Sequence, residues 1–306
     1  MKNKLNRPSI ISSPVELHQL LDLPGPLHPL VSLFDNTQTI VKKGRLPKAF
    51  LFNFYTISYK KRLKGRTGYG QHYYDFDEGT LVFTAPGQLI STDEDTDYFG
   101  ISLLFHPDYI RNHPLGRRMK QYGFFSYESN EALHLSEPEQ KTILAILGNI
   151  DEELKRSLDD FSQDIIISLL EALLNYSNRF YKRQFITRKT VNHELLTKLE
   201  KQLDDYFLAE QGLQTGLLTV ETLAAQVHVS PRYLSDMLRT LIGQNAQQYI
   251  HQKMVEKAKE YLSGTDMTVG EIAYRLGFDY PQSFNKLFKK KTSLTPIKFK
   301  QGFHPN

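Results

Sequence analysis

The stretch that decides the fold of the C-terminal part is T-V-E-T-L-A-A-Q-V-H-V-S-P-R-Y-L-S-D-M-L-R, residues Thr219–Arg239. It is repeated with changes as T-V-G-E-I-A-Y-R-L-G-F-D-Y-P-Q-S-F-N-K-L-F-K, residues Thr268–Lys289. The copies align at an offset of 49 before the turn and 50 after it, where Leu234 aligns with Phe284. Each copy predicts a short helix, a tight turn and a second helix, which together form a helix-turn-helix.

Local signals for helix ends support this prediction. Thr268 and Glu271 have the spacing of a capping box. Ser230 is a good N-cap, and Pro231 after it lacks a donor that the first helical turn would not use. Gly277 falls in the turn of the second copy, where a residue that tolerates positive φ is needed.

The second helix of each copy has one apolar stripe. Leu234 and Leu238 in the first copy, and Phe284 and Phe288 in the second, recur every four residues. A small helical bundle that binds no nucleic acid would show the same stripes. Two copies with basic residues on the uncovered faces favour DNA binding, in which the first helix braces the second in the major groove.

These residues resemble the AraC/XylS family of transcriptional regulators over Leu196–Gly302. The resemblance is carried by A-A-Q-V-H-V-S-P-R-Y-L, Y-I-H-Q-K-M-V-E-K-A-K-E-Y-L, E-I-A-Y-R-L-G-F, S-F-N-K-L-F-K-K and L-T-P-I-K-F-K. Lys253, Ser293 and Lys300 depart from the family pattern, which more often has Arg, Gly and Arg there. The resemblance implies an all-helical domain that reads double-stranded DNA with two helix-turn-helix units.

The resemblance also implies which side chains contact DNA. Those of the first copy are Arg232, Ser235, Asp236 and Arg239; those of the second are Gln282, Asn285 and Lys286, with Lys289 and Lys290 on phosphate. Gln and Asn can pair with adenine, and Arg and Lys with guanine. Asp236 would either accept from a cytosine amino group or repel phosphate. The linking helix, predicted at Ala246–Leu262, would be about 25 Å long, and with the two copies could span the about 34 Å between successive major grooves.

Charge and composition agree with this interpretation. Thr187–Asn306 has 16 basic and 12 acidic residues, whereas Met1–Ile186 has 22 of each, so the net charge of +4 arises in the part that contains the repeat. A basic surface attracts phosphate and makes binding depend on salt. The absence of Cys excludes disulfides and thiolate metal sites and fits a reducing cytoplasm. No apolar signal core opens the chain, and the apolar stretch Ile165–Leu174 is too short to span a bilayer, so we expect a cytoplasmic protein without membrane contact.

The N-terminal part predicts strands and turns. Strands are expected at Ala49–Tyr59, Gln71–Phe76, Thr80–Thr84 and Asp97–Phe105. Turns are expected at Gly65–Gly68, Asp77–Gly79 and Pro86-Gly87. This pattern indicates a small barrel or jelly roll. The stretch G-T-L-V-F-T-A-P-G-Q resembles cupin-like sensing domains over Pro29–Leu135. The fold class is therefore α+β.

A metal-dependent enzyme is not indicated. Catalytic cupins hold a metal with an H-x-H pair, but His72 is followed by Tyr73 and Tyr74. We find no metal site, no cofactor and no catalytic residue. A barrel mouth suits a small ligand, and the candidate lining is Tyr55, Tyr59, His72, Tyr74 and Phe83. Aromatic residues in such a pattern are more often simple core than a binding site, and a His such as His72 is more often an ordinary strand residue.

Two helices are predicted after the strands. The first begins with the capping box of Ser136 and Glu139 and runs to Lys155; the second runs from Asp160 to Tyr181. The apolar stripe of the second comprises Ile166, Leu169, Leu170, Leu173 and Leu174. This stripe would pack in the core or contact a second copy, and the resemblance favours a homodimer. The domain prediction is 1–181 for sensing and dimerisation, 182–195 for a polar, basic linker and 196–306 for DNA binding.

The sequence thus predicts a DNA-binding transcriptional regulator controlled by a small-molecule effector, with RNA polymerase as a further candidate partner. Two alternatives stay open. One is a regulator without such an effector, and the other is a metal-free cupin enzyme tethered to DNA.

Overall fold

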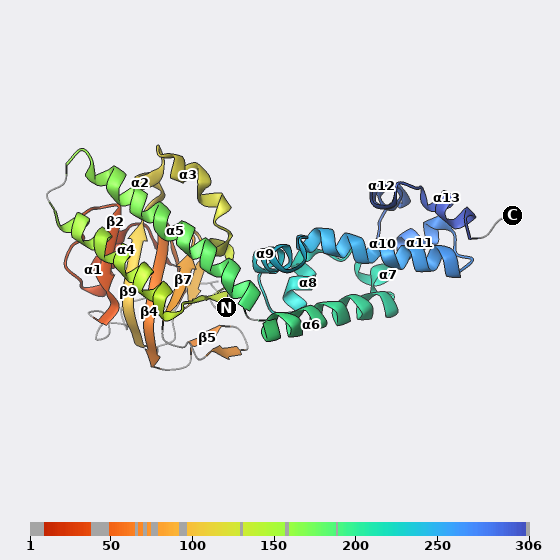
Figure 1. Ribbon diagram of the computed structural model, residues 1–306, viewed down its shortest axis with the longest axis horizontal. Helices are drawn as coiled ribbons and strands as arrows, with labels where there is room; N and C mark the ends of the chain where they lie inside the picture. The colour runs from red at the N-terminus through yellow and green to blue at the C-terminus, as the bar shows by residue number, and fades with distance from the viewer. Residues whose placement is uncertain are drawn as a thin grey trace, which may run out of the picture. The chain divides into compact units, whose positions relative to one another are not determined.

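The computed structural model describes residues 9–37, 49–64, 67–69, 72–74, 79–91, 97–128, 131–156, 159–187 and 189–303. The chain divides into two compact units, Met1–Gln184 and Phe185–Asn306. The first contains strands and helices, and in the second every described element is a helix (Figure 1). The α+β prediction is confirmed at this level, and the division between the units falls inside the predicted linker 182–195.

The first unit is built on a five-stranded antiparallel sheet with the order β10-β7-β4-β9-β2. Its strands are β2 (Val31–Asp35), β4 (Tyr55–Lys64), β7 (Thr80–Thr84), β9 (Asp97–Phe105) and β10 (Leu133–His134). The long central strand β4 pairs with β7 on one side and with β9 on the other. The bounds of β7 and β9 are those that the sequence predicts.

Helices cover one face of this sheet (Figure 1). They are α4 (Glu137–Lys155) and α5 (Ser162–Thr187), which follow the shorter α2 (Pro107–Ile110), α3 (Pro114–Arg118), η2 (Met119–Gln121) and η3 (Gly123–Ser126). Ile57, Leu81 and Leu103 on this face are wholly buried. Across the interface, Tyr59 Oη donates to Gln140 Oε1 of α4 at 3.0 Å, and the Phe83 ring lies 6.2 Å from that of Tyr181 of α5.

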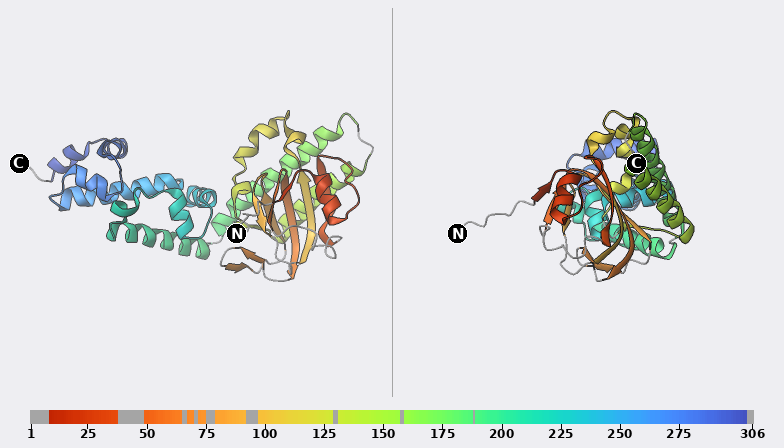
Figure 2. Two further views of the ribbon diagram at one scale, coloured as in Figure 1. Left: turned by 180° about the vertical axis from the view of Figure 1, so that it is seen from behind. Right: turned by 90° about the vertical axis from the view of Figure 1, so that its left-hand side faces the viewer.

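A smaller layer lies on the other face. It contains α1 (Pro14–Leu21) and a three-stranded sheet with the order β1-β3-β8, formed by β1 (Ser9–Ile11), β3 (Ala49–Phe52) and β8 (Leu89–Ser91). Figure 2 shows the strands between α1 on one side and α4 and α5 on the other. The apolar cluster here comprises Ile11, Leu17, Leu21, Phe50, Phe52, Phe54 and Leu104. A separate hairpin pairs β5 (Thr67–Tyr69) with β6 (His72–Tyr74).

The single strand predicted at Ala49–Tyr59 is wrong, because the chain breaks at Asn53 and passes from one sheet to the other. β3 pairs with β1 and β8, whereas β4 pairs with β7 and β9. The Asn53 amide donates to the Ile11 carbonyl at 3.0 Å. Phe54 and Ile57 are both wholly buried, and Phe54 belongs to the apolar cluster beside α1. Gly65, Arg66, Asp77, Glu78 and the ends of the predicted strand Gln71–Phe76 lie outside the described residues.

The predicted pair of helices is confirmed, with a longer second member. α4 has the predicted start and end, and the Glu139 carboxylate accepts from the Ser136 amide at 2.8 Å. α5 continues six residues past Tyr181 to Thr187, and α6 begins at Lys189, so the described part of the predicted linker is helical. Four residues of the predicted stripe are fully buried within the unit, namely Ile166, Leu170, Leu173 and Leu174. Core packing is therefore the role of these four.

The second unit contains eight helices among the described residues. They are α6 (Lys189–Leu208), α7 (Gln211–Thr215), α8 (Val220–Gln226), α9 (Pro231–Ile242), α10 (Ala246–Gly264), α11 (Val269–Arg275), α12 (Pro281–Thr292) and α13 (Pro296–Gln301). We call α8 with α9 the first head and α11 with α12 the second head. α10 links the heads, as predicted, and α6 runs beside it (Figure 1).

Candidate nucleic-acid interface

The second helix of each head buries its apolar stripe and leaves the opposite side open. In α9, Leu234, Met237 and Leu238 are wholly buried. In α12, Phe284 and Phe288 are buried against neighbouring aromatic rings. The nine predicted DNA-contact residues lie outside the apolar stripes of these two helices, and the Asn285 side-chain oxygen is buried without a hydrogen-bond partner among the described residues. Arg232, Arg239, Gln282, Lys286, Lys289 and Lys290 are exposed; Ser235, Asp236 and Asn285 are half-buried.

In the first head, the Asp236 carboxylate joins two arginines. Its Oδ2 accepts from Arg232 Nε at 2.9 Å, and its Oδ1 accepts from Arg239 Nη1 at 2.7 Å. The spacings of four and three residues place all three side chains on one side of α9. Asp236 is 18% exposed, whereas the arginines are 43% and 53% exposed. The acid therefore lies beneath two guanidinium groups that reach solvent.

The corresponding surface of α12 has no acid. At the offset of 50, Lys286 stands where the first head has Asp236. The helix ends with three more lysines in succession, Lys289, Lys290 and Lys291. Among the described residues, no carboxylate lies within ion-pair distance of these four ammonium groups. Such a row of cations suits phosphate more than a base edge.

The turns of the two heads differ in how they reach the left-handed region of φ. His228 has φ +59° in the first turn, and Gly277 has φ +88° at the matching position of the second. The difference has a packing reason, because a Cβ at residue 277 would lie 2.6 Å from the Gly216 carbonyl oxygen. At the C-terminal ends of the second helices the first head has the glycine: Gly243 follows α9, whereas Ser293 follows α12. The unusual Ser293 therefore keeps the geometry that Gly provides elsewhere.

Contacts from α6 and the residues after it to the second head were not predicted. Tyr206 at the end of α6 donates its hydroxyl to the Gly216 carbonyl at 2.7 Å and to the Leu276 carbonyl of the second head at 3.4 Å. Glu210 forms an ion pair with Arg275 of α11. The sequence predicts α10 as the helix that links the heads. Tyr206 in the last turn of α6 and Glu210 just after α6 also contact the second head.

One further exposed residue of the second head was missed. Tyr280 is the N-cap of α12, is 67% exposed and makes no side-chain cap hydrogen bond. The signal was present, because a residue before Pro281 marks the start of a helix. Lys291, which the sequence assigns to phosphate with Lys289 and Lys290, is also exposed. Lys300, by contrast, donates to the Met267 carbonyl at 2.7 Å, so it serves the fold of the unit.

The aromatic residues predicted to line a ligand site lie on the helix-covered face of the sheet. Tyr55 stacks on Phe105 with ring centres 5.0 Å apart, and Phe83 packs 4.4 Å from Phe124. Tyr59 is 4% exposed. These rings fill the core between the sheet and its helices. His72 and Tyr74 lie in β6, and their side chains are outside the described residues. The ligand assignment of this set stays a prediction.

The opposite face of the same strands carries a buried polar row. Ser58 and Ser102 face each other across β4 and β9, with their Oγ atoms 3.1 Å apart. Ser102 Oγ also donates to Asn36 Oδ1 at 3.0 Å. Lys60 is 7% exposed, and burial lowers its pKa to about 8. A buried lysine on a face that also carries side-chain hydroxyl and amide groups is rare in a core that serves only packing.

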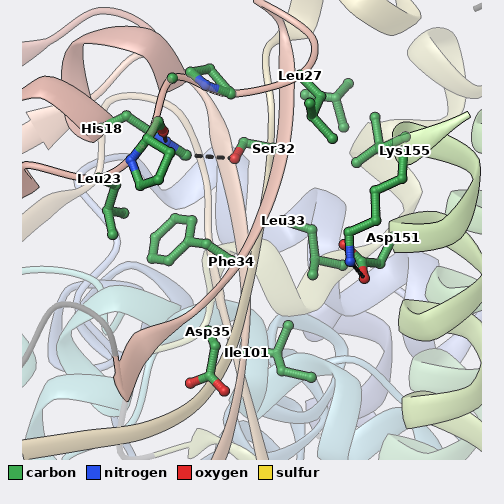
Figure 3. Close-up of a pocket in the computed structure, with 15 residues that line it drawn as sticks. His18, Leu23, Leu27, Ser32, Leu33, Phe34, Asp35, Ile101, Asp151 and Lys155 are labelled. Atoms are coloured by element: carbon green, nitrogen blue, oxygen red, sulfur yellow. Dashed lines mark hydrogen bonds and ion pairs between the residues drawn. The ribbon is translucent and has the colours of Figure 1, made fainter. Parts of the chain in front are cut away.

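A cleft of about 400 Å³ runs around the open edge of β2 (Figure 3). His18 lies on one side of the strand and Lys155 on the other. His18 is already engaged, since its Nδ1 is 2.5 Å from the Pro24 carbonyl oxygen and its Nε2 is 2.7 Å from Ser32 Oγ. Burial lowers the pKa of His18. Lys155 donates to Asp151 Oδ2 at 2.5 Å, so the polar side chains around this cleft satisfy one another.

Two features are absent from the described part of the chain. No group of three or more His, Asp and Glu gathers there as it would around a metal ion. None of the helices in these residues has both the length and the apolar character needed to cross a bilayer.

Comparison with known proteins agrees with the geometry of the second unit. A family described as "Helix-turn-helix domain" matches residues 223–302. An uncharacterized HTH-type transcriptional regulator of Bacillus subtilis, YfiF, is 23% identical over 81% of this chain and 77% of its own. The bifunctional transcriptional activator/DNA repair enzyme AdaA of the same species is 39% identical over 28% of this chain and 41% of its own. The transcriptional activator RhaS of an Enterobacter species is 32% identical over 36% and 37%.

Residues 223–302 of the second unit therefore match a helix-turn-helix domain, and these relatives are transcriptional regulators by name. The chain spans less than half the length of AdaA and of RhaS. The match to AdaA covers 87 residues.

Proposed function

We propose that this protein is a sequence-specific DNA-binding transcriptional regulator of the cytoplasm. One observation carries the proposal, which is that both heads bury the apolar side of their second helix and expose a side rich in Arg, Lys, Gln and Asn. Such side chains pair with base edges and phosphates, and two heads on one linking helix can occupy successive major grooves. The nine predicted contact residues are part of this proposal, with Tyr280 and Lys291 added.

Binding of duplex DNA by the full-length protein tests the proposal. Fluorescence anisotropy with a random-sequence duplex at several salt concentrations should show a steep decline of affinity with salt. The double substitution Lys289→Ala and Lys290→Ala should reduce the slope of log K against log salt by about 0.9 for each phosphate that the variant no longer neutralises. Lys141→Ala, which removes an exposed lysine of α4, is the matched control and should leave the slope unchanged. A folded protein without DNA binding at low salt would refute the proposal.

We propose further that the first unit senses a small molecule. The polar row of Ser58, Lys60, Ser102 and Asn36 supports this, because it places several polar side chains on one face of the sheet, opposite the aromatic set. The row replaces the predicted aromatic set as the region in which we expect the ligand. Native mass spectrometry of the full-length protein purified from its own host should detect a retained small molecule that Lys60→Met loses. A regulator without effector would retain none.

We also propose a homodimer, formed through the outer side of α5. Phe161, Ile165 and Tyr176 are 70%, 43% and 38% exposed and recur at helical spacing, with Leu169 half-buried between them. A second copy would cover this stripe and bring two pairs of heads together. Ile165→Asp should then produce monomers in sedimentation experiments and weaken binding to paired sites. Leu173 is unsuitable for this test because it is wholly buried in the unit's own core.

A further inference from the structure

Resting on the proposed DNA-binding function, we infer that Asp236 is a positioning residue that holds Arg232 and Arg239 for base recognition, so that the first head supplies most of the sequence preference and the second most of the phosphate attraction.

The geometry of the carboxylate supports this inference. Each oxygen of Asp236 accepts from a different arginine, at 2.9 Å and 2.7 Å. The carboxylate is largely covered, which limits its reach to bases or water. Its position beneath the guanidinium groups fixes two long side chains that would otherwise sample many rotamers. Fixing them before binding removes an entropy cost at the moment of recognition.

The atoms used in these bonds leave the recognition edges of both arginines available. Arg232 is engaged through Nε, so Nη1 and Nη2 have no acceptor among the described residues. Arg239 is engaged through Nη1, and its Nε and Nη2 likewise have none there. Two adjacent donors on a planar group match O6 and N7 of guanine, which is the commonest specific contact in the major groove. We therefore expect guanine at two positions of the site.

Charge explains why an acid is useful at this place. A lone arginine on a recognition helix binds any phosphate nearby, and binding without sequence preference competes with specific sites. Asp236 offsets one of the two positive charges and repels phosphate oxygens. The second head has the opposite arrangement, since Lys286 replaces the acid and three lysines follow Phe288. Lysine is a compact cation without a planar fork, and it suits phosphate better than a bidentate base contact.

The test compares Asp236→Asn with Glu260→Gln in the full-length protein. Both substitutions remove one negative charge at similar side-chain size, and Glu260 lies on the linking helix, paired with Lys257 at 2.7 Å. A selected duplex is obtained first from a random pool with the unmodified protein, and a scrambled duplex of the same composition serves as the reference.

We expect Asp236→Asn to weaken binding to the selected duplex by about tenfold, the effect of removing one bidentate base contact at the lower end of its range. The same variant should bind the scrambled duplex at least as tightly as the unmodified protein. Repeated selection with it should weaken the preference at the two guanine positions and keep the rest. Glu260→Gln should preserve both the affinity ratio and the selected sequence.

Two further variants separate positioning from folding. Asp236→Glu retains the charge and should recover part of the preference. Arg232→Lys retains the positive charge without the fork and should lose one guanine position with unchanged binding to the scrambled duplex. An unchanged affinity ratio in Asp236→Asn, or equal loss of preference across the whole site, would overturn the inference. If the unmodified protein binds neither duplex at low salt, the proposed function fails instead.

Discussion

The two heads have the same backbone arrangement, but they differ at nearly every exposed position that this arrangement does not constrain. Where the first head places an acid between two arginines, the second has Lys286, in a helix that ends in three lysines. Where the first begins its second helix with a Ser230 cap, the second begins with the exposed Tyr280. The repeat therefore preserves the buried stripe and the turn, whereas the exposed residues differ and can have different roles in the two heads.

The two heads also differ in how they fill backbone conformations that favour glycine. Each head has two left-handed positions, one in the turn and one after the second helix. The first head fills them with His228 and Gly243, and the second with Gly277 and Ser293. Glycine is needed where another part of the fold packs against the position, and elsewhere a side chain is tolerated at some cost in strain. Substitutions at these positions should therefore affect the two heads unequally.

The largest expected effect is that of Gly277→Ala. The new methyl group would lie 2.5 Å from Tyr206 Oη and 2.6 Å from the Gly216 carbonyl oxygen, at φ +88°. Overpacking and backbone strain together should lower stability by about 3 kcal/mol. His228→Gly, at the matching exposed position, should change stability by no more than about 1 kcal/mol, because strain relief and added chain entropy oppose each other.

Calorimetric unfolding of the two variants beside the unmodified protein gives the measurement. Equal destabilisation by both substitutions would contradict the view that the close approach of Gly216 and Tyr206 to Gly277 makes the second turn the more sensitive one.

The next effect in size concerns the brace from α6. Tyr206→Phe removes a hydroxyl that donates to the carbonyls of Gly216 and Leu276. Because these carbonyls then lack a partner in a buried region, stability should fall by about 1–2 kcal/mol. Hydrogen exchange should be faster in α11 and α12, with α8 and α9 little changed. Equal acceleration in both heads would show that the brace does not act on the second head selectively.

Much of the second unit could be predicted from local signals. Caps such as Ser230 and the Thr268–Glu271 box, the turn at Gly277 and the apolar stripes all act within a few residues, so the sequence displays them directly. The strands Thr80–Thr84 and Asp97–Phe105 were also predictable, since each lies between turn signals.

The errors share a physical cause, which is contact between residues distant in sequence. The break at Asn53 depends on pairing with Ile11, and the Tyr206 brace depends on carbonyls up to 70 residues away. The aromatic residues near Tyr55 were assigned to a ligand site. The alternation of side chains along a strand shows which residues share a face of the sheet, but it does not show what covers that face. The Asp236 pairs, by contrast, have helical spacings that the sequence contains, and only the mutual geometry was missing.

A smaller effect is expected from Ser293→Gly. Ser293 is exposed and has φ +63°, and its amide donates to the Lys289 carbonyl at 2.9 Å. Glycine reaches this conformation without strain, so the substitution should raise stability by about 1 kcal/mol. The reverse change in the first head, Gly243→Ser, should lower it by a similar amount. If both substitutions change the stability in the same direction in thermal unfolding, the C-terminal ends of α9 and α12 are not equivalent.

The smallest effect is a pH dependence in the linking helix beside the second head. Burial lowers the pKa of His251 below its ordinary value of 6.5, and the nearby charges of Lys291 and Lys290 lower it further. Below pH 6.5 the unfolded chain binds a proton that the folded chain does not bind until lower pH, so stability falls as pH falls through this window. His251→Gln removes this contribution, and the variant should lose less stability between about pH 7.5 and about pH 5.5.

The direction in which Lys290 and Lys291 shift the pKa of His251 also tests which head contacts phosphate. Lys290→Gln with Lys291→Gln should raise the pKa of His251, observed by NMR titration of its ring protons, because two positive charges leave its surroundings. Bound DNA phosphate should act in the same direction if these lysines contact it, whereas DNA held by the first head alone should leave the titration unchanged. A His251 titration that responds to neither the lysine substitutions nor DNA would place the phosphate contacts of the second head away from the end of α12.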